Sequence, residues 1–390
     1  MSKKVIINAL TPLLLSAVCA SAFASPDGAH RKMYPLYRIK PNTPSYAPSG
    51  YSPVQIRKAY GFTKLKAQGE GQVIAIIDAF DNPNAESDLN VFSSTFGLPS
   101  CTTANGCFEK VYASGTKPSP SKGWGTEIAL DIQWAHATAP KAKIMLVEAA
   151  NSYTDSLNTA IKVAIEKGAT VVSMSYGGSE FSSESVYDKM YQVSGVEFVA
   201  SAGDGGTGVI CPACSPYVLA VGGTSLKVDT SGNYLSESAW AGSGGGLSAY
   251  QPQPAYQKGF PIPENTTNKR GVPDVAYNAN PNTGFSVYNT YQNPGWLVIG
   301  GTSAGAPQWA GVLAVAKSAS PTKLENMHAL IYNIARLHYS NTFNDITTGT
   351  NGSCGYYCSA QVGYDYVTGL GTPKVDALVD FIATGGLDRK

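Results

Sequence analysis

The sequence predicts an α/β protein in which a mostly parallel sheet is covered by helices on both faces. Two observations support this fold class: short apolar runs typical of buried strands recur along the chain, and stretches with helical periodicity lie between them. A third observation sets the domain count. After residue 50 the 390-residue chain has no internal repeat and no clean linker, so we expect a single domain over residues 51–385.

The expected elements follow one another in the order that a parallel sheet requires. We predict strands over residues 73–77, 143–148, 170–174 and 198–200, and helices over 126–136 and 156–167. From about Ser215 onward the chain is richer in glycine and turns. Functional residues of such sheets gather at the carboxyl ends of the strands.

The N-terminus has the pattern of an export signal. Lys3 and Lys4 precede an apolar stretch through Leu15, and residues 22–24 (Ala-Phe-Ala) form a small-x-small cleavage site. We therefore predict a signal peptide over residues 1–24 and a secreted protein, extracellular or periplasmic. A membrane anchor is the alternative, but this apolar core is too short to span a bilayer. Residues 25–50 are rich in Pro, Ser and Tyr and predict an extended or disordered lead-in.

The charge composition argues against polyanionic partners. The chain has 28 lysines and arginines against 27 aspartates and glutamates, and no basic block. We therefore expect no nucleic-acid partner and no membrane partner after signal removal, and we expect a monomer.

Six cysteines remain after the signal, and they fall into three close pairs. In an exported chain this spacing predicts three local disulfides, Cys101/Cys107, Cys211/Cys214 and Cys354/Cys358. A redox role for Cys211-x-x-Cys214 is an alternative, although no thioredoxin-like βαβ pattern surrounds it. A zinc site is another, although no histidine lies at ligand spacing.

A serine among small residues is the first candidate for chemistry. Ser303 lies in the run Gly-Thr-Ser-Ala-Gly-Ala-Pro (301–307), just before an apolar helical stretch at 309–316. A helix start offers free N–H groups and a positive dipole end, which suit a nucleophile whose attack creates an oxyanion. The alternative is that Ser303 only caps the helix.

Three acids are the candidate partners of this serine. Glu127 and Asp131 lie four residues apart, hence on one face of a predicted helix, and a coupled pair of carboxyls can take up and return a proton. Asp204 follows a predicted strand and, if protonated, can donate to an oxyanion. The alternatives are a solvated helix face and an aspartate that stabilises its own turn. None of the four histidines has the surroundings of a serine-protease base.

These motifs together resemble the signature of the sedolisin family, the serine-carboxyl peptidases. Further matches are the runs at 173–178, 220–225 and 270–276, and the similarity extends from about residue 52 to 378. The resemblance implies a subtilisin-like fold with Ser303 as nucleophile, Glu127 as general base and acid, Asp131 as its orienting partner and Asp204 as oxyanion-hole donor. It also implies that substrate pairs with the segment Ser175, Tyr176, Gly177 and Gly178. Asp78, at the end of the first strand, is interpreted as a supporting or structural residue.

The resemblance further implies one structural Ca²⁺ near the C-terminus. Asp345 and Asp365 would supply carboxylates, and Ile346, Gln361 and Gly363 backbone carbonyls, which are the hard oxygen ligands that Ca²⁺ prefers. The alternative is two ordinary turn aspartates.

The resulting functional hypothesis is a secreted, acid-active serine-carboxyl endopeptidase that hydrolyses polypeptides through an acyl-enzyme. Two alternatives stand beside it: a histidine-dependent subtilisin relying on His136, and a catalytically inactive, calcium-stabilised binding protein on the same scaffold. One departure from the family is that only about 25 residues separate the signal from the region of similarity, in place of a long propeptide.

Overall fold

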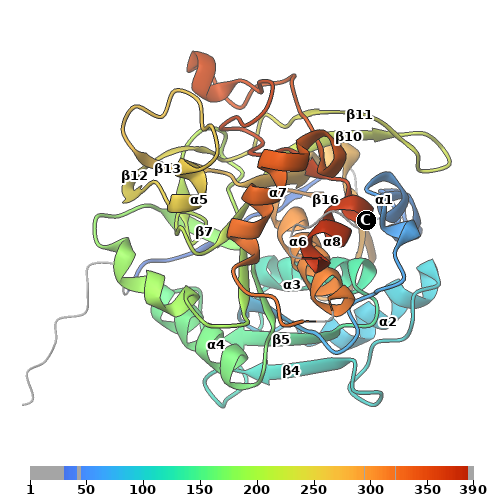
Figure 1. Cartoon of the computed structure of the whole chain (residues 1–390). Helices are drawn as coiled ribbons and strands as arrows, with labels where there is room; N and C mark the ends of the chain where they lie inside the picture. Colours follow the sequence, from blue (N-terminus) through green and yellow to red (C-terminus); the bar gives the residue numbers. More distant parts are fainter. Residues whose placement is uncertain (1–29, 42–44, 294, 321, 385–390) are drawn as a thin grey trace, which may run out of the picture.

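The central element of the fold is an eight-stranded sheet that is parallel except at one edge. It is seen in a computed structural model that describes residues 30–41, 45–293, 295–320 and 322–384 (Figure 1). The order β11-β10-β8-β6-β3-β5-β4 is completed by β14, which pairs with β10. The strands are β3 (Val73–Ala79), β4 (Phe108–Tyr112), β5 (Lys143–Ala149), β6 (Val171–Met174), β8 (Glu197–Ser201), β10 (Leu219–Val228), β11 (Tyr234–Ala239) and β14 (Val275–Asn278).

Helices cover both faces of this sheet, as predicted. On one face α3 (Lys122–Thr138) and α6 (Gly305–Ala319) pack against each other and on the strands, and on the other α4 (Thr154–Glu166) packs on β3 and β5. Two apolar cores result, because the side chains of a buried strand alternate between the faces. The remaining helices are α1 (Pro53–Ala59), α2 (Ala85–Phe96), α5 (Ala255–Lys258), α7 (Met327–Thr342) and α8 (Val375–Ala383), with 3-10 turns η1 (Phe62–Lys64), η2 (Glu184–Tyr191), η3 (Pro281–Thr283), η4 (Thr302–Ala304) and η5 (Gly355–Cys358).

Helix α3 is longer and more deeply buried than its sequence indicates. The predicted helix over 126–136 extends to Lys122–Thr138, and every residue from Trp124 to Thr138 is buried. The helix is enclosed because α2 and α6 pack along it and strand β15 (Phe285–Asn289) crosses it. Polar residues on this helix are therefore inside the protein, so the solvated-face interpretation of Glu127 and Asp131 is wrong.

The described part of the lead-in, residues 30–41 and 45–50, is extended, and it is held in two short pairings. Strand β1 (Tyr34–Pro35) pairs with β7 (Tyr176–Ser179), and β2 (Arg38–Ile39) pairs with β16 (Gly295–Gly300). The predicted signal peptide at 1–24 lies outside the described residues. The other strands are β9 (Ile210–Cys211), β12 (Gly246–Pro252), β13 (Lys269–Val272), β17 (Phe343–Asn344) and β18 (Thr372–Pro373).

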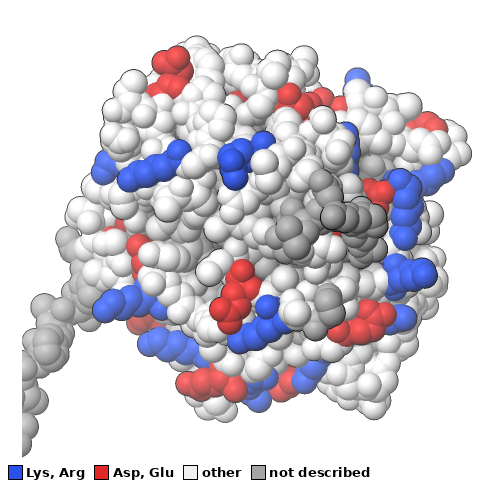
Figure 2. Space-filling view, in the orientation of Figure 1, with Lys and Arg blue, Asp and Glu red and all other residues white. Residues whose placement is uncertain are grey.

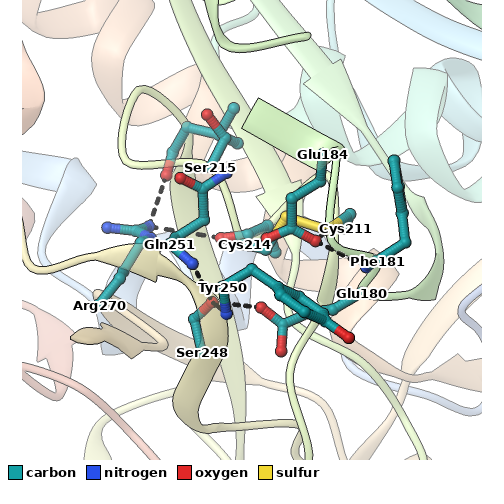
Figure 3. Close-up of a disulfide and its surroundings, with 12 residues drawn as sticks. Glu180, Phe181, Glu184, Cys211, Cys214, Ser215, Ser248, Tyr250, Gln251 and Arg270 are labelled. Carbon is teal, nitrogen blue, oxygen red and sulfur yellow. Dashed lines mark hydrogen bonds between the residues drawn. A yellow bond between two sulfur atoms is a disulfide. The ribbon is translucent and has the colours of Figure 1, made fainter. Parts of the chain in front are cut away.

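All three predicted disulfides are present: Cys101–Cys107, Cys211–Cys214 and Cys354–Cys358. Figure 3 shows the second of them beside Glu184. Each bridge closes a loop of only a few residues, so it fixes local loop shape more than it stabilises the whole fold.

A buried ion pair ties the second half of the chain together. Arg270 Nη2 lies 2.7 Å from Asp274 Oδ2, and both side chains are fully buried. The Asp274 carboxylate also accepts hydrogen bonds from the Ala220 N–H and the Tyr332 hydroxyl. The charge of Arg270 and that of His328 hold the pKa of Asp274 well below its usual range, against the effect of burial.

We expect Asp274→Ala to lower the free energy of unfolding by about 3–5 kcal/mol, because it leaves the Arg270 guanidinium buried without a partner. The depressed pKa means that the contribution of Asp274 is present at pH 4 and is lost only in stronger acid. Denaturant unfolding at pH 4 measures the change, with exposed Asp155→Ala as the control. A loss below 1 kcal/mol would contradict this assignment.

On the face drawn in Figure 2, acidic and basic side chains are interspersed and form no extended area of one sign. Within the described ranges, no helix is both long and apolar enough to cross a bilayer.

Candidate active site

Ser303 stands at the junction between a strand and a helix. Strand β16 ends at Gly300, the backbone turns at Gly301 with φ of +100°, and Ser303 follows in η4 directly before α6. Its hydroxyl donates to Glu127 Oε2 at 2.9 Å and also lies 3.2 Å from the Ser175 carbonyl oxygen. The sequence placed Ser303 at a helix start, and the structure brings it to the predicted base.

Glu127 and Asp131 lie one turn apart on α3, and both are fully buried. Desolvation raises the pKa of each well above its usual value, and repulsion from Asp131 and Asp78 raises that of Glu127 further. Asp78, near the end of β3, is also fully buried, and its pKa is raised by burial and by Asp131. Three carboxyls therefore interact behind the serine.

This cluster must share protons. Glu127 Oε1 and both Asp78 oxygens have no hydrogen-bond donor among the described residues when the carboxyls are ionised. A buried carboxylate without a donor is costly, whereas a carboxylic acid can itself donate to a neighbour. The three carboxyls therefore titrate as a unit, because ionisation of one raises the pKa of its neighbours.

Asp204 lies beside the serine on the loop that follows β8. Its Oδ1 accepts from the Thr302 N–H at 2.8 Å and the Thr302 hydroxyl at 2.9 Å. Its Oδ2 is buried without a hydrogen-bond donor in the described part of the chain, and the Arg38 Nε lies 3.9 Å away. Burial raises the pKa of Asp204 to about 6, against the hydrogen bonds from Thr302 and the charge of Arg38. Below that pH Asp204 is protonated and has a proton to donate.

The predicted substrate segment borders the serine. Ser175 follows β6, and Tyr176, Gly177 and Gly178 belong to β7. A Cβ on Gly177 would lie 2.3 Å from the Ile210 side chain, and one on Gly178 would lie 2.8 Å from the sulfur of Met33. Side chains at these two positions would prevent the neighbouring segments from pairing closely with β7, which explains why both residues are glycine.

The histidines stand apart from this cluster. His136 is buried with Nε2 2.8 Å from the Pro99 carbonyl oxygen, and burial lowers its pKa. His328 lies against Asp274, and His30 contacts Asp155. Among the described contacts none joins a histidine to Ser303, which argues against a histidine-dependent subtilisin.

The predicted calcium ligands Asp345 and Gly363 lie together near the C-terminus, and Gln361 contacts Asp365. The Tyr339 hydroxyl lies 3.0 Å from Asp345 Oδ1 and 3.2 Å from the Gly363 carbonyl oxygen. Asp365 is buried, which raises its pKa to about 6, and its carboxylate accepts from the N–H groups of Gln361, Val367 and Thr368. In the described residues neither aspartate has a lysine or arginine within ion-pair distance, so a hard cation with oxygen ligands fits this charge.

Comparisons with known proteins agree with the fold. The profile of the subtilase family matches residues 111–356. Kumamolisin from Bacillus sp. (strain MN-32) is 32% identical over 84% of this chain and 63% of its own length. Sedolisin from Pseudomonas sp. (strain 101) is 27% identical over 86% and 62%. The solved structure of Pseudomonas sedolisin, a serine-carboxyl proteinase complexed with two molecules of pseudo-iodotyrostatin, superposes with a TM-score of 0.75 at 26% identity, covering 87% of this chain and all of that one.

The chain belongs to the subtilase family of serine peptidases. Within that family its relatives and its fold place it among the sedolisins. The chain spans about three fifths of the length of the curated relatives it matches.

Sequence reasoning missed several residues at the site. Thr302, which holds Asp204, lies in the run that marks Ser303, but nothing in that run predicts its contact with Asp204. Arg38 and Leu36 come from the lead-in, which has no period from which a contact could be predicted. For Asp78, the position at a strand end was the one sequence feature that pointed to the site. In the structure Asp78 interacts with the other two carboxyls.

Proposed function

We propose that the chain is a secreted, acid-active serine-carboxyl endopeptidase with Ser303, Glu127 and Asp131 as its triad. The observation that carries the proposal is the 2.9 Å hydrogen bond from the Ser303 hydroxyl to Glu127, whose carboxyl is buried together with that of Asp131. A buried carboxyl is a stronger base than a solvated one, because desolvation disfavours its charged form.

The geometry supports acyl transfer in two halves. Ser303 Oγ attacks the substrate carbonyl carbon while Glu127 takes its proton, and Asp131 and Asp78 share the proton and limit the charge change at Glu127. Glu127 then returns the proton to the leaving amine. Water attacks the ester with Glu127 again as base, which releases the acid and restores the serine.

Asp204 supports the acid dependence of this scheme. The oxyanion of each tetrahedral intermediate needs donors, and the Ser303 N–H and a protonated Asp204 are the groups available beside it. Asp204 loses its proton as the pH rises through about 6. We therefore expect hydrolysis to decline above that pH. The pH–rate profile on an unfolded protein tests this, and highest activity at neutral or alkaline pH counts against it.

The calcium loop belongs to the same proposal, with Asp345, Ile346, Gln361, Gly363 and Asp365 as ligands. Bound Ca²⁺ would neutralise the two carboxylates and hold the loop closed by the Cys354–Cys358 disulfide.

Calcium removal is expected to destabilise the fold. At free Ca²⁺ 100-fold above its Kd, binding stabilises the folded state by about 2.7 kcal/mol. Thermal unfolding with and without a chelator should show a lower Tm without Ca²⁺. Asp345→Ala should unfold at the lower Tm in both conditions. A wild-type Tm that does not change when the chelator is added would contradict the calcium site.

The buried acids also make stability depend on pH. Burial raises the pKa values of Glu184 and Glu197 to about 7. A carboxyl whose pKa is raised by folding makes its full contribution to stability at a pH below its pKa in the unfolded chain, near 4.5. That contribution is lost as the pH rises through the pKa in the folded chain, about 7. We expect the Tm to be highest near pH 4 and to fall toward pH 8, with several kcal/mol lost at about 1.4 kcal/mol per pKa unit. A Tm that rises from pH 4 to pH 8 contradicts this.

The alternative is an inactive, calcium-stabilised binding protein on the same scaffold. It predicts no hydrolysis at any pH by purified wild-type protein. Mapping the products of an unfolded protein at acid pH, with Ser303→Ala as the control, decides between the two and also separates internal from terminal cleavage.

A further inference from the structure

An apolar cavity borders strand β7 beyond the candidate active site, and the side chain of Met33 lies against it. Met33 is 4% exposed, and a Cβ on Gly178 of β7 would lie 2.8 Å from its sulfur. A free volume of about 30 Å³ remains beside Met33, which exceeds the space that one water molecule needs. The walls of the cavity include the Cys211–Cys214 disulfide and the side chains of Leu157, Tyr176, Phe181, Tyr187 and Tyr191.

The backbone of the lead-in fixes how far this cavity lies from the nucleophile. The Leu36 carbonyl oxygen accepts a hydrogen bond from the Ser303 N–H at 3.0 Å, and Tyr34 lies opposite Gly177 in an antiparallel pairing. In this register Met33 is the fourth residue, counted toward the N-terminus from the residue whose carbonyl meets Ser303. A polypeptide that binds β7 in the same way presents its own fourth residue to the cavity. We call this cavity the fourth-residue pocket.

The wall of the fourth-residue pocket contains a buried carboxyl group. Glu184 is 4% exposed, and its Oε2 accepts from the Phe181 N–H at 2.9 Å and lies 3.0 Å from the Cys211 sulfur (Figure 3). Its Oε1, like the Tyr187 hydroxyl, is buried with no hydrogen-bond partner among the described residues. Leaving such an oxygen unpaired costs free energy. The pocket therefore lacks a hydrogen-bond donor that a bound residue can supply.

The charges around the pocket do not neutralise this carboxyl. Burial raises the pKa of Glu184 to about 7, and repulsion from Glu180 and Asp188 adds to the effect. The charged and titratable groups around the pocket are Glu180, Asp188, Tyr187, Asp155, Arg31 and Arg270. Arg31 lies over the Phe181 ring and Arg270 acts on Asp188, and no ion pair joins Glu184 to a cation of the described ranges. A cation on the bound residue is therefore the missing partner.

Lysine has the size and the charge that fit the pocket. Its side chain follows the path of a methionine side chain and is one heavy atom longer, and that atom is an ammonium nitrogen with three hydrogen-bond donors. The free volume beside Met33 accommodates the extra atom. Arginine, which is three heavy atoms larger than methionine, fits this space less well.

We propose that the fourth-residue pocket selects the fourth acyl-side residue of the polypeptide substrate, and that Glu184 favours lysine there near neutral pH and an uncharged residue such as methionine in acid. The inference rests on the proposed peptidase function and names a preference of the same site. Glu184 determines specificity through the side chain of the substrate and takes no part in breaking the peptide bond.

The direction of the pH effect follows from the charge of Glu184. At pH 4 Glu184 carries a proton, so a lysine in the pocket buries its ammonium without an opposite charge. An ammonium beside the ionised form lowers the pKa of the carboxyl by about 1–3 pH units, and each unit corresponds to a tenfold change in affinity. The preference for lysine is therefore present near neutral pH and is lost as the pH falls through the lowered pKa of Glu184.

The experiment mixes two peptides with blocked ends in one solution with the full-length protein. Both contain the run Tyr-Pro-Leu-Tyr, and they differ only in the residue before it, which is lysine in one and norleucine, an uncharged residue of the length of methionine, in the other. Mass spectrometry of the products gives the ratio of the two kcat/KM values. This ratio depends neither on the amount of active protein nor on the pH dependence of the chemical step, because both are common to the two peptides.

We expect the lysine-to-norleucine ratio to be below 1 at pH 4 and to rise about tenfold by pH 6.5 in the wild type. In Glu184→Gln the ratio is expected to stay constant. Asp188→Asn is the matched control, because Asp188 lines the same pocket but its Oδ1 accepts from the Ser215 hydroxyl at 2.7 Å, and this variant should keep the rise. A constant ratio in the wild type, or an equal rise in Glu184→Gln, overturns the inference.

Hydrolysis of the two peptides separates this inference from the proposed function. If both peptides are cut and their ratio does not change with pH, the role of Glu184 is wrong and the proposed function stands. If neither peptide is cut by protein that far-UV circular dichroism shows to be folded, the proposed function itself has failed.

Met33→Lys tests the pocket without hydrolysis. In the Ser303→Ala background we expect Met33→Lys to lower the Tm more at pH 4 than at pH 7, because only an ionised Glu184 can pair with the ammonium. Adding Glu184→Gln should remove this difference between the two pH values. A loss of Tm that is equal at both pH values while Glu184 is present contradicts the pairing.

Discussion

Glu127→Gln is expected to lower kcat/KM for peptide hydrolysis about 100- to 10,000-fold, the range that a positioned general base contributes. The amide has nearly the shape of the carboxyl, so it fits the buried site, but it cannot take the proton of the Ser303 hydroxyl that now donates to Oε2. Repulsion among the acids also falls, so the folded state should not be weakened. Steady-state kinetics at pH 4, with far-UV circular dichroism to verify folding, measure the effect.

The control for this substitution is Glu166→Gln, at the exposed end of α4, which should keep full activity. Combining Glu127→Gln with Ser303→Ala should cost little more than Ser303→Ala alone, because the two groups act as one unit. A Glu127→Gln protein that retains a tenth of wild-type activity would show that a group other than Glu127 accepts the proton of the Ser303 hydroxyl.

Asp204→Ala should reduce kcat about 100- to 1,000-fold with little change in KM, since it removes a donor used mainly in the transition state. The matched variant is Asp204→Asn. Thr302 binds one carboxyl oxygen through its N–H and hydroxyl, which orients an asparagine with its carbonyl toward Thr302 and its NH₂ at the position of the other oxygen, Oδ2.

An asparagine at this position keeps a donor at every pH. Asp204→Asn should therefore retain more activity than Asp204→Ala and should keep it above pH 6, where the wild type loses the proton of Asp204. Profiles of kcat against pH for the three proteins decide this. If both variants fall equally and keep the wild-type profile, Asp204 does not stabilise the oxyanion.

The sequence predicted those features of the fold that depend on local pattern. Apolar runs identified β3, β5, β6 and β8, and the four-residue spacing placed Glu127 and Asp131 on one helix face. Burial of that face did not follow from the pattern, because α2, α6 and β15 come from distant parts of the chain. Burial is what raises the pKa values of both carboxyls, which the spacing alone does not predict.

The lead-in was the least predictable part of the site. Residues 30–50 have neither helical nor strand periodicity. The strands formed in the described part, β1 and β2, pair with partners more than 100 residues away, such as Gly177 opposite Tyr34. Arg38, which approaches Asp204, is held by a different pairing of this kind, with Gly300 of β16. The calcium ligands, in contrast, were inferred from resemblance alone, and the metal itself stays a prediction.

Because helix α3 is buried, the stability of the fold and the integrity of the candidate active site depend on the same packing. Helix α3, which carries Glu127 and Asp131, also carries Trp134. The buried indole N–H of Trp134 donates to the Ser286 carbonyl oxygen at 3.0 Å. Glu127 and Asp131 thus lie in the packed interior and not on an exposed loop. Heat or denaturant should abolish turnover and tertiary structure in one transition, so residual activity can serve as a direct gauge of how much folded protein remains.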